Sequence, residues 1–377
     1  KKNLIVWLKN MNHVEHIYIH IPFCTHICAY CDFVKSHYQP QLADKVVERL
    51  IENINHVDST RIKTLYIGGG TPSALSLNQL EHLCQTIAQK WPSIQEWSAE
   101  INPEDMTFEK MSYLAKCGVN RLSMGVQATQ PRLLEIITRH HTFDDVKKVT
   151  SWAHECGIND ISYDLMYGLP TQTIEEFEDS MHDVLTLNPT HLSLYALTIE
   201  PNTAFGRQKI QPVDNELEGQ MYECAIKTLT QAGYEHYEVS SFTKDKHYSK
   251  HNLSYWKYAN FIGLGPGAAS KVDNRRWTNT KNIHHYTLNE KLVQEDIQLS
   301  EYDQVIEKLM MGLRLNQIVT WNHINHGSDI RSKVENVLEK TQQQGWVILN
   351  DEGIQSTASG RLFLHDIIVT IMQAFDE

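Results

Sequence analysis

The chain has 377 residues, 41% of them hydrophobic, so it has room for about two or three domains with a real core. Its formal net charge of −12 and pI near 5.9 count against a nucleic-acid partner, because phosphate binding requires a basic surface. No apolar run approaches the ~20 residues of a membrane helix, and seven cysteines without a secretion signal indicate a cytoplasmic location.

Short runs rich in β-branched and aromatic residues alternate with longer amphipathic runs along the first half of the chain. The predicted strands cover residues 16–20, 64–67, 97–101, 121–125, 161–166 and 191–197. The predicted helices between them cover residues 42–55, 76–90, 108–117, 143–156 and 174–187. Repeated strand–helix units indicate an α/β fold with a parallel sheet and helices outside it.

The first predicted strand is followed by Cys24, Cys28 and Cys31 on one loop. Three thiolates can hold three corners of an iron–sulfur cube and leave the fourth iron open to a substrate. A zinc site is the alternative, with His26 or His20 as the fourth ligand, although we expect His20 to pack beneath the loop. Common zinc modules have a second ligand pair further along, and none follows here, so the spacing favours an iron–sulfur site.

Polar residues lie at or beyond the ends of several later strands. Glycines 68–70 end the second strand and let backbone groups approach a ligand closely, although a simple turn is the alternative. Glu100, Gln127 and Asp164 each follow a strand, and such residues at successive strand ends indicate one converging site. Arg139 is the cation that we expect to face a carboxylate there. Two histidines that follow it are expected to be exposed: His140 and His141.

The Cys-x3-Cys-x2-Cys spacing, with Tyr30 before the third cysteine, resembles the motif of the radical S-adenosylmethionine (radical SAM) superfamily. The resemblance implies a 4Fe-4S cluster held by Cys24, Cys28 and Cys31, with its open iron bound by the amino and carboxylate groups of SAM. An electron from the cluster would then cleave SAM to a 5′-deoxyadenosyl radical, while the protein supplies position and exclusion of water. The six strand–helix units match the partial TIM-like (β/α)6 barrel of that superfamily.

Four motifs narrow the resemblance to the oxygen-independent coproporphyrinogen III oxidase-like (HemN-like) family. They occur in family order between Tyr18 and Pro170: Tyr-Ile-His-Ile-Pro-Phe-Cys, Gly-Gly-Gly-Thr-Pro, Arg-Leu-Ser-Met-Gly-Val-Gln and Asp-Leu-Met-Tyr-Gly-Leu-Pro. By this resemblance, the positions that contact SAM are Tyr18, Tyr30, Gly69, Gly70, Thr71, Glu100, Gln127, Arg139 and Asp164.

The resemblance also divides the chain into three parts. Residues 12–245 are expected to form the radical SAM barrel domain, and residues 246–300 a connecting segment with a glycine-rich loop and the run His251-Asn-Leu-Ser-Tyr-Trp256. Residues 301–377 are expected to form a small, winged-helix-like α+β C-terminal domain. Within it, residues 345–349 followed by Gly353 and by residues 362–364 predict a β-hairpin after a helix.

Two departures separate the chain from the true coproporphyrinogen dehydrogenases. Phe33 stands where those enzymes carry a further cysteine, and the 23 residues before Cys24 are too few for the N-terminal segment that covers their active site. By contrast, the run from His251 to Trp256 resembles a motif of the family's haem-chaperone branch, HemW. A histidine can bind haem iron while aromatic rings pack on the porphyrin. In the alternative interpretation, Tyr255 and Trp256 belong to the core and His251 to a loop.

The resemblance therefore implies a haem chaperone that binds a 4Fe-4S cluster, SAM and haem, with His251 as the haem ligand. The implied partners are haem, a haem-accepting protein and an electron donor such as a flavodoxin or ferredoxin, with peripheral membrane association through the acceptor. SAM could be cleaved or only bound. The alternative function is oxidative decarboxylation of coproporphyrinogen III to protoporphyrinogen IX, whereas the acidic charge disfavours RNA modification.

Overall fold

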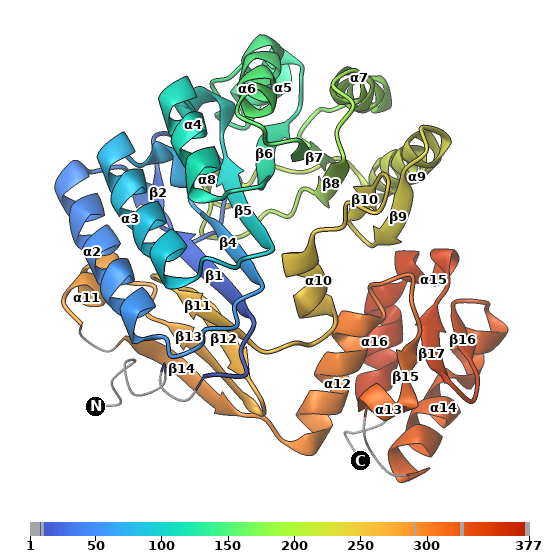
Figure 1. Ribbon diagram of the computed structural model, residues 1–377. Helices are drawn as coiled ribbons and strands as arrows, with labels where there is room; N and C mark the ends of the chain where they lie inside the picture. Colours follow the sequence, from blue (N-terminus) through green and yellow to red (C-terminus); the bar gives the residue numbers. More distant parts are fainter. Residues whose placement is uncertain (1–7, 9–10, 290–291, 325–327, 374–377) are drawn as a thin grey trace.

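The computed structural model describes residues 8, 11–289, 292–324 and 328–373. In this part of the chain, 12 strands form one curved sheet in the order β14-β13-β12-β11-β1-β4-β5-β6-β7-β8-β10-β9 (Figure 1). None of the described helices has the length and apolar character needed to cross a bilayer. The six predicted strands are confirmed as parallel neighbours: β1 (His16–Ile21), β4 (Thr64–Gly69), β5 (Glu96–Ile101), β6 (Arg121–Gln127), β7 (Asp160–Tyr167) and β8 (His191–Ala196).

Helices line the outer side of this sheet, and local signals fix where they begin and end (Figure 1). The side chains of Ser76, Thr142 and Thr173 each close a capping box with the residue three places on. Gly118 ends its helix in the left-handed region, with φ of 111°. The predicted helices are thereby confirmed: α2 (Pro40–His56), α3 (Leu77–Lys90), α4 (Phe108–Cys117), α6 (Phe143–Glu155) and α7 (Ile174–Leu185).

The segment predicted as a connection between domains instead extends the main sheet. Its strand β11 (Phe261–Leu264) pairs with β1 in parallel, and β12 (Ala269–Val272), β13 (Arg275–Asn279) and β14 (Val293–Gln298) follow as antiparallel neighbours. Glycines interrupt the apolar pattern of this segment because the backbone is crowded. A Cβ on Gly263 would lie 2.0 Å from the carbonyl oxygen of Ala269.

Shorter elements complete the barrel region. β9 (Glu235–Glu238) and β10 (Ser241–Thr243) form the other edge of the main sheet, and β2 (Phe23–Cys24) pairs with β3 (Ser36–His37) beside the cysteine loop. The remaining helices and 3-10 turns here are η1 (Pro72–Ala74), η2 (Pro103–Asp105), α5 (Pro131–Ile136), α8 (Ala204–Gln208), α9 (Asn215–Gln231), α10 (Lys250–Trp256) and α11 (Ile283–Thr287).

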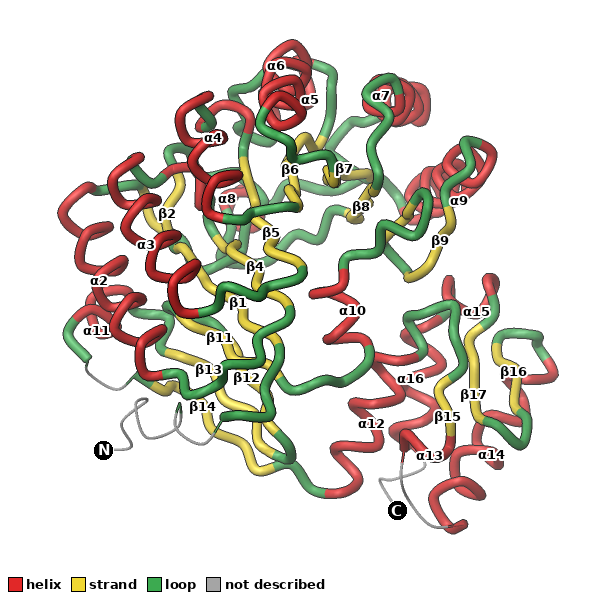
Figure 2. Tube along the Cα trace, in the orientation of Figure 1, coloured by secondary structure: helices red, strands yellow, loops and turns green. Residues whose placement is uncertain are grey.

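The C-terminal domain has a hydrophobic core of its own, which includes Val305, Leu309, Val334 and Ile367. Its three strands lie in the order β15-β17-β16 beside the helices (Figure 2). The predicted hairpin is confirmed for β16 and β17, but its extension to residues 362–364 is wrong, because Thr357 caps a helix there. The elements are α12 (Glu301–Gly312), β15 (Val319–Thr320), α13 (Trp321–Ile324), α14 (Ser328–Gln343), β16 (Val347–Leu349), β17 (Gly353–Ser356), α15 (Ala358–Leu362) and α16 (Leu364–Gln373).

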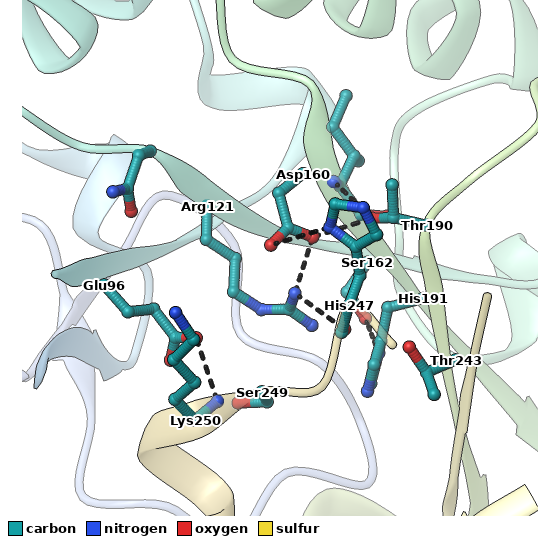
Figure 3. A network of polar contacts seen from close by, with 12 residues as sticks. Glu96, Arg121, Asp160, Ser162, Thr190, His191, Thr243, His247, Ser249 and Lys250 are labelled. Carbon is teal, nitrogen blue, oxygen red and sulfur yellow. Dashed lines mark hydrogen bonds and ion pairs between the residues drawn. The ribbon is translucent and has the colours of Figure 1, made fainter. Parts of the chain in front are cut away.

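A buried polar network holds α10 against the N-terminal ends of the parallel strands (Figure 3). The backbone N–H groups of Lys250 and His251 donate to the Glu96 carboxylate over 2.9 and 2.8 Å. Arg121, whose side chain is 3% exposed, donates from Nη1 to Asp160 Oδ1 over 2.6 Å. Because Glu96 receives the first N–H groups of α10, it fixes the position from which this helix enters the molecule.

Arg121 should be essential to stability, because it is the cation that faces the carboxylates of Glu96 and Asp160. We expect Arg121→Met to lower the free energy of unfolding by about 3–5 kcal/mol, the usual cost of breaking a buried ion pair. Chemical denaturation measures this change. Lys147→Met removes an exposed pair with Asp144 and should cost below about 1 kcal/mol. Equal costs in the two variants would contradict the assigned role.

Candidate functional site

Side chains alternate between the two faces of each parallel strand, so every second side chain points into the barrel. In β1, Ile17, Ile19 and Ile21 are fully buried in the main hydrophobic core, whereas Tyr18 lines an internal cavity. The same alternation supplies one or more cavity-lining residues from each of the six strands. These are Tyr18, Tyr66, Glu100, Ser123, Asp164 and Tyr195.

The first cavity, which we call the cysteine cavity, lies at the C-terminal ends of the strands and has a volume of about 500 Å³. All three predicted cluster cysteines line it: Cys24, Cys28 and Cys31. So do all but one of the predicted SAM positions: Tyr30, Gly69, Gly70, Thr71, Glu100, Gln127, Arg139 and Asp164. Residues far apart in sequence thus face one space, as expected for polar residues that follow successive parallel strands.

The glycine run brings the end of β4 against the cysteine loop. A Cβ on Gly70 would lie 2.7 Å from the carbonyl oxygen of Phe23 and 3.0 Å from Cys24 Sγ, so no side chain fits there. Thr71 donates from Oγ1 to Cys24 Sγ over 3.6 Å. Burial raises the pKa of the Cys24 thiol to about 12, so it stays protonated until a metal displaces the proton.

The arrangement of thiols fits a cluster better than a single zinc ion. Among the described residues, no three His, Cys, Asp or Glu side chains converge closely enough to hold one ion. In a cube, each thiolate binds a different iron, so the cysteine sulfurs stand further apart than around a single ion.

His20 packs beneath the loop as predicted, with Nε2 bonded to the Val34 carbonyl oxygen over 2.7 Å and Nδ1 to the Tyr18 hydroxyl over 3.0 Å.

Two carboxyl groups stand in the cysteine cavity with raised pKa values. Burial raises the pKa of Glu100 to about 7, although Gly69 N–H and the Tyr66 hydroxyl each donate to it over 2.9 Å. Burial likewise raises the pKa of Asp164 to about 6, and Ser123 donates to its Oδ2 over 2.8 Å. The buried Oδ1 of Asp164 has no hydrogen-bond partner among the described residues. A ligand with a hydroxyl or amino donor would satisfy this atom.

Arg139 already has a carboxylate partner in this structure. Its Nε and Nη2 donate to the two oxygens of Glu104 over 3.0 and 3.2 Å, and Nη2 also donates to the Gly125 carbonyl over 2.6 Å. His141 stands 3.4 Å from the same carboxylate and is buried, so its predicted exposure is wrong. Although burial alone raises the pKa of Glu104, the contacts with His141 and Arg139 hold it at about 2. His140 is exposed, as predicted.

Gln127 has a backbone conformation that side chains rarely adopt. Its φ is 65°, and the pairing of β6 with β7 shifts register between Gly125 and Gln127. Such an irregularity re-aims a side chain at the end of a strand, and strain of this kind concentrates at functional sites. Here it brings Gln127 into the lining of the cysteine cavity.

A second cavity, which we call the aromatic cavity, adjoins the cysteine cavity and has a volume of about 470 Å³. It shares Tyr66, Glu100 and Tyr195 with the cysteine cavity, so these three residues form the partition between the two. Tyr18 lines this cavity and stacks on Tyr66 with ring centroids 6.2 Å apart, rather than lining the cysteine cavity with the other predicted SAM positions. The remaining rings on its wall are Tyr255, Trp256, Tyr258 and Phe261.

His251 lies at the wall of the aromatic cavity and is fully buried. Its Nδ1 is 2.7 Å from Thr64 Oγ1, and its Nε2 is 2.7 Å from the Tyr255 hydroxyl. Burial, together with the nearby His16, lowers the pKa of His251 to about 3, so the ring is neutral. To bind a metal through Nε2, His251 would have to give up its contact with Tyr255.

Sequence reasoning missed three groups at this site. Tyr66 and Tyr195 stand at inward positions of β4 and β8, and the period-two pattern alone could have located them. Glu104, the partner of Arg139, lies in the 3-10 turn η2, and no local signal pairs it with a residue 35 positions away.

Comparison with known proteins agrees with this geometry. The sequence pattern of the radical SAM superfamily matches residues 18–184, and that of the HemN C-terminal domain matches residues 299–363. The haem chaperone HemW of Bacillus subtilis is 35% identical over 373 residues, which cover 94% of this chain and 98% of that protein. The chain belongs to the HemW family. HemW of Escherichia coli is 32% identical over 365 residues, covering 93% of this chain and 96% of the relative.

The fold is also that of a solved enzyme. The structure of coproporphyrinogen III oxidase (HemN) from Escherichia coli matches with a TM-score of 0.85, covering 98% of this chain and 92% of that one, at 23% identity. The predicted fold class, a radical SAM barrel with a HemN-type C-terminal domain, is thus confirmed. Membership of the radical SAM superfamily also implies a 4Fe-4S cluster and SAM as cofactors.

The raised pKa of Glu100 gives a testable pH dependence. This carboxyl group has an ordinary pKa of 4.5 and a folded-state pKa of about 7, so the folded protein holds the proton more tightly. The stabilisation from the protonated form is therefore complete below pH 4.5 and is lost as the pH rises through about 7. Glu100→Gln cannot ionise, so its free energy of unfolding relative to the wild type should rise over this range. Denaturation of the cofactor-free proteins at several pH values measures the difference, and a constant difference would contradict the assignment.

Proposed function

We propose that this protein is a haem chaperone that binds a 4Fe-4S cluster, SAM and haem and passes haem to an acceptor protein. The observation that carries the proposal is the pair of adjoining cavities. One is lined by three thiols and ionisable groups and the other by aromatic rings and a histidine, and they share Tyr66, Glu100 and Tyr195. A polar cofactor and an apolar tetrapyrrole could thus occupy neighbouring spaces.

In this proposal, Cys24, Cys28 and Cys31 hold the cluster, and the glycine run and the strand-end residues hold SAM. When bound, the cluster and SAM would supply electron transfer and radical chemistry. The chain's own contribution is position: Gly69 and Gly70 permit close approach, and Asp164 Oδ1 offers an unfilled acceptor. Arg139 is held in place by Glu104, and its Nη1 is the guanidinium nitrogen without a hydrogen bond to a described residue.

Haem would occupy the aromatic cavity, and His251 is the residue that would bind its iron. Cavities of this size, lined by rings and a few polar groups, are typical ligand sites. The neutral imidazole is the form that binds iron, and with its proton on Nδ1 the ring would donate to Thr64 Oγ1 and be oriented by that bond. The acceptor protein, an electron donor of the flavodoxin or ferredoxin type and peripheral membrane association through the acceptor belong to the same proposal.

The cluster assignment predicts that no cysteine of the three can be replaced. After anaerobic reconstitution, Cys24→Ala, Cys28→Ala and Cys31→Ala should each lose the broad visible absorption and most of the iron. Cys156→Ala is the matched control, since this free thiol caps α6 outside the cavity, and it should keep both. Full iron retention in the triple alanine variant would refute the cluster site.

The haem assignment predicts opposite results for two neighbouring side chains. His251→Ala should weaken haemin binding and shift the Soret band, because packing cannot replace an imidazole–iron bond. Tyr255→Phe removes the hydroxyl that occupies His251 Nε2, so it should retain the wild-type spectrum and bind haemin at least as tightly. An unchanged spectrum and affinity in His251→Ala would show that another residue is the ligand.

A further inference from the structure

A basic cleft lies where the edge of the main sheet meets the C-terminal domain. Its volume is about 500 Å³, and its walls include Lys271 from β12, Lys308 from α12 and His323 from α13. Three basic side chains from three separate elements therefore face this basic cleft. Figure 1 shows α12 next to this side of the main sheet.

Lys271 is a buried cation without a matching anion. It is 6% exposed and forms no ion pair with a described carboxylate. Its Nζ donates to the Tyr258 carbonyl over 3.0 Å and to Asn260 Oδ1 over 3.2 Å, and it stands 3.8 Å from the centre of the Tyr258 ring. Burial lowers the pKa of Lys271 to about 8, so most of it is charged at neutral pH. A buried charge of this kind is costly unless an anion pairs with it.

The carboxylates of Asp273 and Glu307 favour the charged form of Lys271, but neither forms an ion pair with it and each contacts another partner. The direct partner of Lys271 across the strands is Arg276, a like charge, and Arg276 is paired with Glu307 of α12. Asp273 also lines the cleft, but its carboxylate accepts from Asn260 Nδ2 over 2.9 Å and faces His13 Nε2 at 3.3 Å. The Asp273 carboxylate is therefore bonded to Asn260 and His13 and does not contact Lys271 directly.

The basic cleft adjoins the aromatic cavity, and Lys271 and Tyr258 line both. A ligand that fills the aromatic cavity therefore reaches Lys271 at one end. At the other end it meets Glu100. Anionic groups on such a ligand are attracted to the lysine end, where the Glu307 carboxylate is already paired with Arg276.

We propose that Lys271 and Lys308 bind the carboxylate side chains of the tetrapyrrole at the junction of the aromatic cavity and the basic cleft. This inference rests on the proposed haem-binding function and adds to it an orientation, with the propionates toward the C-terminal domain. It also gives α12 a role in binding, since Lys308 comes from that helix.

Haemin and haemin dimethyl ester test the inference, because esterification removes the carboxylate charges and keeps the ring and the iron. Spectroscopic titration of the full chain with both should show haemin bound about tenfold or more tightly than the ester, as expected for charge-assisted hydrogen bonds. Lys271→Met and Lys308→Met should each weaken haemin binding toward the affinity of the ester and leave the ester affinity unchanged. Lys271→Arg should restore haemin binding, and Lys257→Met, at an exposed lysine, should have no effect.

The outcomes separate this inference from the function on which it rests. Equal affinities of the wild type for haemin and the ester would overturn the carboxylate site while leaving haem binding intact. A loss of haemin and ester binding to the same extent in Lys271→Met and Lys308→Met would overturn it as well. Binding of neither compound by the wild type would refute haem binding itself, and the carboxylate site with it.

Discussion

The period-two alternation of six parallel strands is the constraint on which the rest of this structure depends. Residues such as Ile17, Ile19 and Ile21 pack in the main hydrophobic core, so the residues between them in the strand must face the inside of the barrel. Those inward residues are tyrosines, carboxylic acids and small polar groups, which cannot fill the barrel as aliphatic layers would. Cavities therefore remain inside the sheet. Burial in them raises the pKa values of Glu100 and Asp164.

The position of α10 links this barrel to the C-terminal domain. Glu96 at the N-terminal end of β5 receives the first N–H groups of the helix, which sets His251 against Thr64 at the wall of the aromatic cavity. At the other end of α10, Arg314 stands 4.4 Å from the Trp256 ring. The proposed haem site thus depends on contacts from both domains, and a loss of the C-terminal domain would open the cavity.

Much of the fold could be predicted from the sequence, because local signals specify it. Alternating apolar runs defined the parallel strands, and caps such as Ser76 and Gly118 defined the helix ends. The position of the cysteines, Glu100 and the other polar residues at the ends of successive strands was enough to group them at one site. What the sequence did not reveal depends on distant partners: Glu104 pairs with Arg139 across 35 residues, and the 246–300 segment pairs with β1 although it is far away in sequence. The place of Tyr18 in the lining of the aromatic cavity is likewise not encoded by a motif.

One reconstituted sample can distinguish haem delivery from porphyrin synthesis. The protein is reconstituted anaerobically with its cluster, supplied with SAM and a reductant, and then given haemin or coproporphyrinogen III in parallel. We expect saturable haemin binding and no decarboxylation of coproporphyrinogen III. Repeated turnover to protoporphyrinogen IX would contradict this expectation and would make Phe33, in place of the extra cysteine, an irrelevant difference.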